Sequence, residues 1–93
     1  MEYLVHLEST RQGPADDAAQ AAAAEAEGAR VAAMLAEGTL VRIWRDPGRH
    51  ASWMLLRVDS PEQLHSLLAS LPFFVWLNIQ VHPLAAHNAQ PHD

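Results

Sequence analysis

Cysteine is absent from the 93-residue sequence, and basic residues are scarce. Without cysteine the chain forms no disulfide, and it offers neither thiolate ligands for zinc nor a cysteine nucleophile. Six Lys and Arg stand against eleven Asp and Glu, which gives a formal net charge of −5. Proteins that bind nucleic acid by neutralising its phosphates usually carry a basic surface. We therefore expect no nucleic-acid partner.

Long hydrophobic runs are missing as well. No segment approaches the roughly 20 apolar residues of a membrane span. The opening segment MEYLVHLES also lacks the basic region and continuous apolar run of a signal peptide. We therefore expect no membrane partner and a cytoplasmic location. The length suits a single domain over residues 1–93, ending in a polar tail from about residue 85 to 93.

Alternating apolar and polar residues predict four strands. A loop at 10–14 follows the first, and Pro47 and Gly48 form the turn of a hairpin between the second and third. The predicted strands cover residues 2–9, 39–46, 50–59 and 73–84.

Two helices separate these strands. An alanine-rich helix begins at Asp16 and stops before Gly38, with acidic residues at the positive end of its dipole. The segment 60–72 begins with Ser60 and has Gln63 three positions later, which is the pattern of a capping box. The order βαββαβ predicts an α+β, ferredoxin-like fold, in which a four-stranded antiparallel sheet carries both helices on one face.

The sheet face opposite the helices is mixed in character. In the last strand the aliphatic residues should face the helices, so the other face receives Trp76, Asn78, Gln80 and His82. Such a face is too amphipathic for a buried core and too aromatic for plain solvent exposure. It suits an enclosed ligand cavity or a hydrated subunit interface.

Glu27 interrupts the apolar stripe of the first helix, where it falls between Val31 and Met34. A carboxylate there costs free energy unless it is paired or has a raised pKa, and carboxylates with a raised pKa serve as general bases. Alternatively, Glu27 reaches solvent or pairs with a structural arginine, because the stripe is poorly defined in so alanine-rich a helix.

Four of the six basic residues lie between Arg42 and Arg57. Most arginines on a hairpin are solvated or paired with surface acids. Arg45 is different because it adjoins Trp44, and a guanidinium beside an aromatic ring suits bidentate capture of a carboxylate-bearing ligand.

The six histidines do not show the close spacing of a metal site. We therefore expect no metal and no other cofactor. His6 and His50 are better candidates for hydrogen-bond donors in a pocket.

Two segments, EGTLVRIWRDPGRHASW and LHSLLASLPFFVWLNIQVHPLAAH, resemble the muconolactone Δ-isomerase family of the β-ketoadipate pathway. Family members carry the patterns E-G-T-W-R-H-L-W-R, G-x-Y-A-N-Y and L-H-x-x-L-x-x-L-P-L-F-P-Y-M-x-I-x-V. The shared positions are Glu37, Gly38, Thr39, Trp44, Arg45, Gly48, Ala51, Leu64, His65, Leu68, Leu71, Pro72, Phe74, Ile79, Val81 and His87.

The sequence departs from the family at positions that bear on the ligand. Glu27 falls on the family's glutamate, whereas Ala24 and Gly28 stand where lysines are usual. His50 and Ser52 replace the tyrosine and asparagine of the third strand. Asn78 and Gln80 stand where the family has acidic residues. Loss of two cations and two acids together suggests a substrate other than muconolactone, either less anionic or with more aromatic surface.

The resemblance implies a proton shift on a butenolide or a related enolisable ring compound, a small lactone being the simplest such partner. We assign Glu27 as the proton shuttle and His50 or Ser52 as the donor to the developing oxygen anion. Arg45 with Trp44 and Trp76 would clamp the ligand. Further candidates for substrate binding are His6, Arg42, Trp53 and Asn78.

Two other functions stay open. The chain could be a non-catalytic binding or assembly module of the same fold, or a family enzyme that performs elimination or cyclisation on a biosynthetic intermediate. Family members form dimeric α/β barrels joined into a decamer, so the resemblance also implies a homo-oligomer built from dimers.

Overall fold

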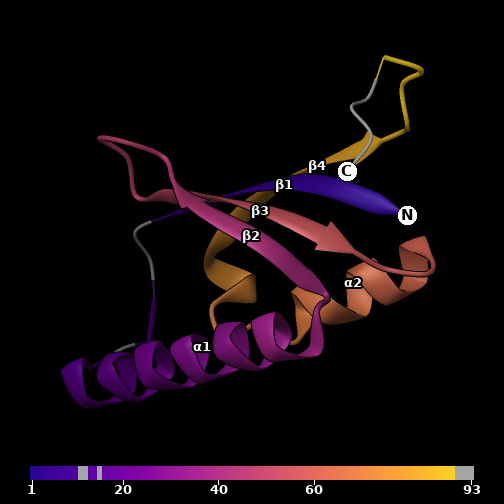
Figure 1. The fold of residues 1–93 in the computed structure, drawn as a ribbon. Coiled ribbons are helices and arrows are strands. Elements are labelled where there is room, and N and C mark those ends of the chain that lie inside the picture. The colour runs from indigo at the N-terminus through magenta and orange to yellow at the C-terminus, as the bar shows by residue number, and fades with distance from the viewer. Residues whose placement is uncertain (11–12, 15, 90–93) are drawn as a thin grey trace.

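A computed structural model of the chain describes residues 1–10, 13–14 and 16–89 (Figure 1). The predicted loop at 10–14 and the predicted tail at 85–93 therefore lie partly outside the described residues. The elements in chain order are β1 (Glu2–Ser9), α1 (Asp17–Glu37), β2 (Leu40–Arg45), β3 (Ala51–Arg57), α2 (Pro61–Ala69), the 3-10 turn η1 (Phe74–Trp76) and β4 (Leu77–Leu84).

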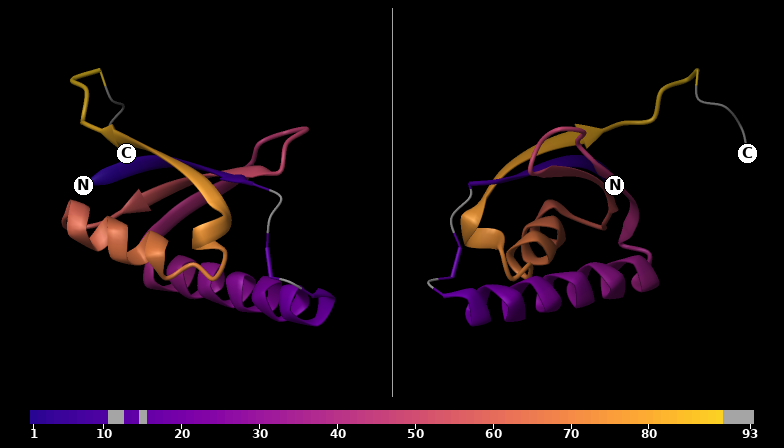
Figure 2. Two further views of the ribbon diagram at one scale, coloured as in Figure 1. Left: turned by 180° about the vertical axis from the view of Figure 1, so that it is seen from behind. Right: turned by 90° about the vertical axis from the view of Figure 1, so that its left-hand side faces the viewer.

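The four strands form one antiparallel sheet in the order β2-β3-β1-β4. Both helices lie on the same side of this sheet, and the opposite side is uncovered in the chain (Figures 1 and 2). This arrangement confirms the predicted ferredoxin-like fold. None of the helices in the described part of the chain combines the length and the apolar character that a membrane crossing requires.

The core lies between the sheet and the helices. In β1 the alternation buries Tyr3, Val5 and Leu7 on the helix side. Met34 is the buried residue that α1 contributes. Leucines of the α2 region complete the core, and they are Leu64, Leu67, Leu68 and Leu71.

α2 begins at its predicted N-cap, Ser60, and Asp16, the predicted first residue of the first helix, is the N-cap of α1. The Asp16 carboxylate accepts a hydrogen bond from the Ala19 amide at 2.7 Å, and Gly38 ends α1 with a φ of 83°. The Ser60 hydroxyl accepts a hydrogen bond from the Gln63 amide at 3.1 Å, and the Gln63 side chain accepts one from the Asp59 amide. The local hydrogen bonds therefore determine where each helix begins.

The prediction of a strand from residue 73 is wrong over its first four residues. The amide of Trp76 donates to the Phe73 carbonyl at 2.8 Å, which closes a 3-10 turn, and β4 begins only at Leu77. Trp76 therefore lies outside the sheet, and Val75 is 76% exposed. A short apolar run does not distinguish a strand from a helical turn, so periodicity alone could not place this boundary.

A register shift in β2 decides the direction of its side chains. Leu40 pairs with Leu56, but Arg42 pairs with Leu55, so the strand contains one extra residue between these pairs. After this bulge Arg45 pairs with Ser52, which in turn pairs with the buried Leu7. Arg45 therefore projects to the helix side of the sheet.

Candidate active site

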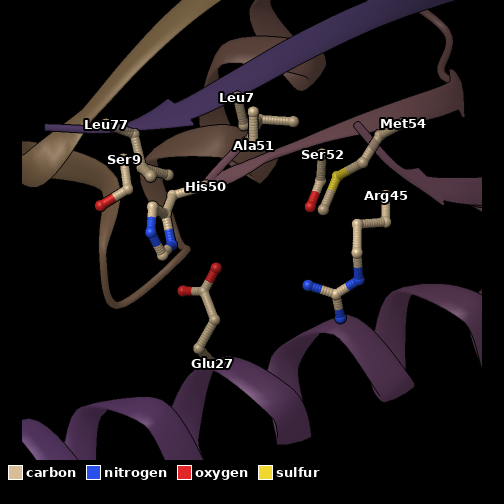
Figure 3. A pocket seen from close by; sticks show the side chains of 9 residues that line it. All are labelled: Leu7, Ser9, Glu27, Arg45, His50, Ala51, Ser52, Met54 and Leu77. Atoms are coloured by element: carbon tan, nitrogen blue, oxygen red, sulfur yellow. The ribbon is translucent and has the colours of Figure 1, made fainter. Parts of the chain in front are cut away.

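A cavity of about 270 Å³ lies between α1 and the helix side of the sheet (Figure 3). Every strand of the sheet and the turn before β3 contribute to its wall. The lining residues are Leu7, Ser9, Glu27, Arg45, His50, Ala51, Ser52, Met54 and Leu77. The cavity therefore combines an apolar wall with a carboxylate, a guanidinium, an imidazole and hydroxyl groups.

Glu27 is half-buried and points from α1 toward the sheet (Figure 3). Its Oε1 accepts a hydrogen bond from the Phe73 amide at 3.1 Å. Burial raises the pKa of Glu27 above its usual value, and the hydrogen bond from Phe73 opposes this effect only in part. No ion pair reaches Glu27 within the described residues. The arrangement is a proton acceptor held in place by the backbone.

Arg45 projects into the same cavity from the end of β2 (Figure 3). Among the arginines of the described chain, Arg30, Arg49 and Arg57 form ion pairs, whereas no such pair involves Arg42 or Arg45. Of these last two, Arg45 lines the cavity. Its guanidinium is therefore available to an anionic group of a ligand.

His50 and Ser52 reach the cavity from the turn and from β3 (Figure 3). The His50 carbonyl accepts a hydrogen bond from the Ser9 amide at 2.8 Å, which ties the turn to the end of β1. The predicted set Glu27, Arg45, His50 and Ser52 thus comes together from distant parts of the sequence. These groups provide a base, a cation and hydrogen-bond donors around one space.

Other predicted binding residues lie on the opposite face of the sheet. By register, Trp53 pairs with His6 and with Trp44, and Asn78 pairs with Glu8. Arg42 lies on this face too, since it pairs with Leu55. One chain therefore does not bring these residues to the cavity that contains Glu27.

Trp76 occupies a third position. Its ring lies 6.0 Å from the Phe73 ring, and its carbonyl accepts hydrogen bonds from both the amide and the hydroxyl of Thr10. It is not among the residues that line the cavity. The predicted clamp of Arg45, Trp44 and Trp76 is therefore not assembled around the cavity in this chain.

Sequence reasoning missed two contributions to the site. The Phe73 amide holds Glu27, and Ser9 at the end of β1 lines the cavity. A backbone donor leaves no signal in the side-chain pattern, whereas Ser9 could have been noted as the polar residue that ends an apolar strand. Within the described part of the chain, no group of three potential ligands could hold a metal ion.

Comparison with known proteins gives a consistent result. A family model described as Muconolactone delta-isomerase matches residues 1–90. A Muconolactone Delta-isomerase 2 from Acinetobacter lwoffii is 35% identical over 97% of this chain and 96% of its own length. The Muconolactone Delta-isomerase of Pseudomonas aeruginosa is 34% identical over 96% of this chain and 95% of its own. A crystal structure of muconolactone isomerase matches with a TM-score of 0.92 and 28% identity, covering 100% of this chain and 97% of that one.

The environment of Glu27 predicts a pH-dependent effect on stability. Because its pKa is raised in the folded state, ionisation of Glu27 opposes folding, and stability falls as the pH rises above the unfolded-state pKa through the folded-state pKa. Glu27→Gln keeps an oxygen that can accept from Phe73 but carries no charge. We expect the variant to gain stability relative to the parent at about pH 7, and this gain to disappear below about pH 4.

Urea unfolding of both proteins at the two pH values measures this difference. Glu25→Gln is the matched control, because Glu25 lies on the same helix and is exposed. If the free energy of unfolding depends on pH in the same way in both glutamine variants, burial does not destabilise the ionised form of Glu27.

Proposed function

The chain belongs to the muconolactone delta-isomerase family, and from this premise we propose that it moves a proton and a double bond in a butenolide or a related enolisable ring compound. The reaction removes a proton from a carbon conjugated to a carbonyl and returns it to another carbon of the ring system. The double bond shifts between these positions, and no atom is gained or lost overall. The chemistry needs a base, a donor to the enolate oxygen and a group that orients the substrate.

The observation that carries the proposal is that one cavity is lined by the half-buried carboxylate of Glu27 and by the guanidinium of Arg45, which forms no ion pair with the described residues. The Phe73 amide binds Oε1, which leaves Oε2 to take the proton from carbon and return it. The raised pKa makes proton uptake by this carboxylate easier than by an exposed one, because a general base works best when its pKa approaches the operating pH.

Arg45 would bind the carboxylate of the substrate. A guanidinium presents two parallel N–H donors to a carboxylate, so it sets the orientation of the ring as well as its affinity. His50 or Ser52 would then donate to the carbonyl oxygen, where negative charge develops. The apolar side chains of Leu7, Met54 and Leu77 would pack against the ring.

The size and the charged lining of the cavity favour a small substrate that carries one carboxylate. Its volume of about 270 Å³ falls just below the range of about 300–1,000 Å³ that is usual for ligand pockets. Of the residues that line the cavity, Arg45 is the arginine that could bind one carboxylate of the substrate. A second carboxylate would be repelled by Glu27. Because His50 and Ser52 replace the tyrosine and asparagine of the family pattern, we propose that the neutral part of the substrate differs from that of muconolactone.

The uncovered face of the sheet supports self-association. Trp44 is 43% exposed there, and Leu84 on the edge strand, which pairs with Glu2, is 45% exposed. After β4 the chain also extends away from the rest of the molecule (Figure 2). We propose a homo-oligomer built from dimers in which this face meets a second copy and the extended segment reaches a neighbour.

Replacement of Glu27 by Gln tests the catalytic proposal. We expect kcat for muconolactone or a substituted butenolide to fall about 10²- to 10⁴-fold, because shape is kept and proton transfer is lost. Ligand affinity should stay close to that of the parent. Exchange of the ring C–H in D2O, followed by proton NMR, measures the proton-transfer step directly.

Glu25→Gln again provides the control and should retain parental activity. Unchanged exchange in Glu27→Gln would exclude Glu27 as the proton shuttle. Binding of these ligands by a parent that catalyses no exchange would favour the non-catalytic module.

Replacement of Arg45 by Lys tests the clamp. We expect Kd for the carboxylate-bearing ligand to rise several-fold, because the charge remains but the planar pair of donors is lost. Arg45→Met should weaken binding further. Arg57→Lys, an exposed arginine outside the cavity, is the control. Binding by both Arg45 variants at the parental Kd, measured by calorimetry, would show that Arg45 is structural.

Sedimentation at micromolar concentration tests the assembly. We expect a species larger than a monomer, together with tryptophan emission shifted to the blue of exposed indole, because association would cover Trp44. Trp44→Ser should weaken the association. A monomer with solvent-like emission in the parent would contradict the proposed oligomer.

A further inference from the structure

In and beside the turn between β2 and β3, neighbouring residues make contacts on different sides. Arg45 and His50 line the cavity, whereas Asp46 and Arg49, next to them in the sequence, contact side chains of β1. On each side of the turn a cavity residue is thus adjacent to an anchored residue. Any movement of the anchored pair would move the cavity pair with it.

The anchoring contacts form a continuous chain, hereafter the hairpin network. The Glu8 carboxylate accepts a hydrogen bond from Arg49 at 2.7 Å, and the Arg49 Nε lies 4.0 Å from the Asp46 Oδ2. This same Asp46 oxygen lies 3.0 Å from the His6 Nε2. His6 is 9% exposed, and its ring packs against Trp53 with centroids 4.4 Å apart. The network therefore joins two β1 residues to the turn through side chains alone.

Backbone contacts alone leave the turn weakly held. The Asp46 amide donates to the Ala51 carbonyl at 3.0 Å, and the Arg49 amide donates to the Asp46 carbonyl at 3.2 Å. Gly48 adopts a φ of 77°, which permits the tight reversal. The Ser9 amide adds the bond to the His50 carbonyl. These bonds close the turn, but the side-chain contacts hold it against β1.

The electrostatics agree with this geometry. The bond from Arg49 holds the pKa of Glu8 below its usual value, and Glu8 raises the pKa of Arg49. Arg49 is exposed and Glu8 is partly exposed, so their attraction is screened by water. The His6–Asp46 contact is more enclosed, since the two side chains are 11% and 23% exposed. We expect Asp46 to be the stronger of the two anchors.

We propose that the hairpin network, made of His6, Glu8, Asp46 and Arg49, positions Arg45 and His50 for ligand binding and turnover. This inference rests on the proposed isomerase function. The network residues touch no ligand in this arrangement, because they lie on the other side of the turn from the cavity. They are positioning residues, and they act through the cavity residues beside them in the sequence.

The chain supplies a matched comparison for this role. Arg57 donates to Glu2 at 2.7 Å, the same distance as in the Arg49–Glu8 pair, and both arginines are largely exposed. Each pair joins β1 to β3 or its preceding turn. The Arg57 pair lies at the opposite end of these strands from the cavity. Loss of either pair should therefore affect stability similarly, but only the Arg49 pair should affect the site.

The experiment compares Arg49→Met with Arg57→Met in the 93-residue chain, with muconolactone or a substituted butenolide as the substrate. We expect Arg49→Met to raise KM about three- to fivefold, as suits an exposed pair, and Arg57→Met to leave KM unchanged. Arg49→Lys should restore much of the parental value, because it returns a cation to Glu8. Asp46→Asn should raise KM about tenfold and lower kcat as well, since the turn carries His50.

Hydrogen exchange gives a readout that does not depend on turnover. The amides of Asp46 and Arg49 and the amide of Ser9 report on closure of the turn. We expect them to exchange faster in Arg49→Met and Asp46→Asn than in the parent, and at the parental rate in Arg57→Met. Mass spectrometry of peptides that span these residues measures the effect in any oligomeric state.

The outcomes separate the two proposals. Faster exchange together with higher KM in the Arg49 and Asp46 variants, and neither in Arg57→Met, supports the network. Equal behaviour of Arg49→Met and Arg57→Met in both measurements overturns it. If the parent turns over no lactone, the proposed function fails, and hydrogen exchange with calorimetric binding of muconolactone still decides whether the network positions the turn.

Discussion

The pairing of β2 with β3 determines the chemistry on each side of the sheet, because successive residues of a strand face opposite ways. Leu40 is buried in the core, and strict alternation from that position would direct Arg45 away from the helices. The extra residue between the Leu40 and Arg42 pairs reverses this direction. Arg45 then joins Glu27 in the cavity, and Trp44 moves to the uncovered face. The candidate site therefore depends on a single irregularity in one strand.

The composition of α1 explains why a cavity exists beside Glu27. Alanine favours the helix but supplies little volume to pack against the sheet. Met34 fills the core near the end of α1, whereas Ala23, one turn before Glu27, has only a methyl side chain. Close packing at one end of the helix anchors it, and sparse packing at the other end leaves room for a ligand. A helix with larger side chains would have the same fold without the cavity.

The sequence predicted the fold well wherever an element is determined by residues close together in the chain. The bounds of β1, the caps of both helices and the direction of Glu27 follow from periodicity and from short hydrogen bonds. It failed at Trp76, because the apolar run before β4 is compatible with both a strand and a turn. The bulge in β2 and the Phe73 amide beside Glu27 were beyond its reach, since each depends on contacts between distant segments. The sequence predicted either a ligand cavity or a subunit interface on the aromatic face, whereas the described cavity lies on the helix side, where the β2 bulge directs Arg45.

The two sides of the sheet are linked through the turn between β2 and β3. Arg45 and His50 line the cavity, and their sequence neighbours Asp46 and Arg49 contact side chains of β1. A second copy packed on the uncovered face would remove water from the His6–Asp46 contact. The hydrogen bond between the two side chains strengthens as water is excluded, although the Asp46 carboxylate also loses hydration. Asp46 would keep its hydrogen bond to His6, and Arg49 its hydrogen bond to Glu8, so these groups would stay paired when water is removed. Assembly on one face would thus stiffen the turn and make the site on the other face more rigid than it is in a single chain.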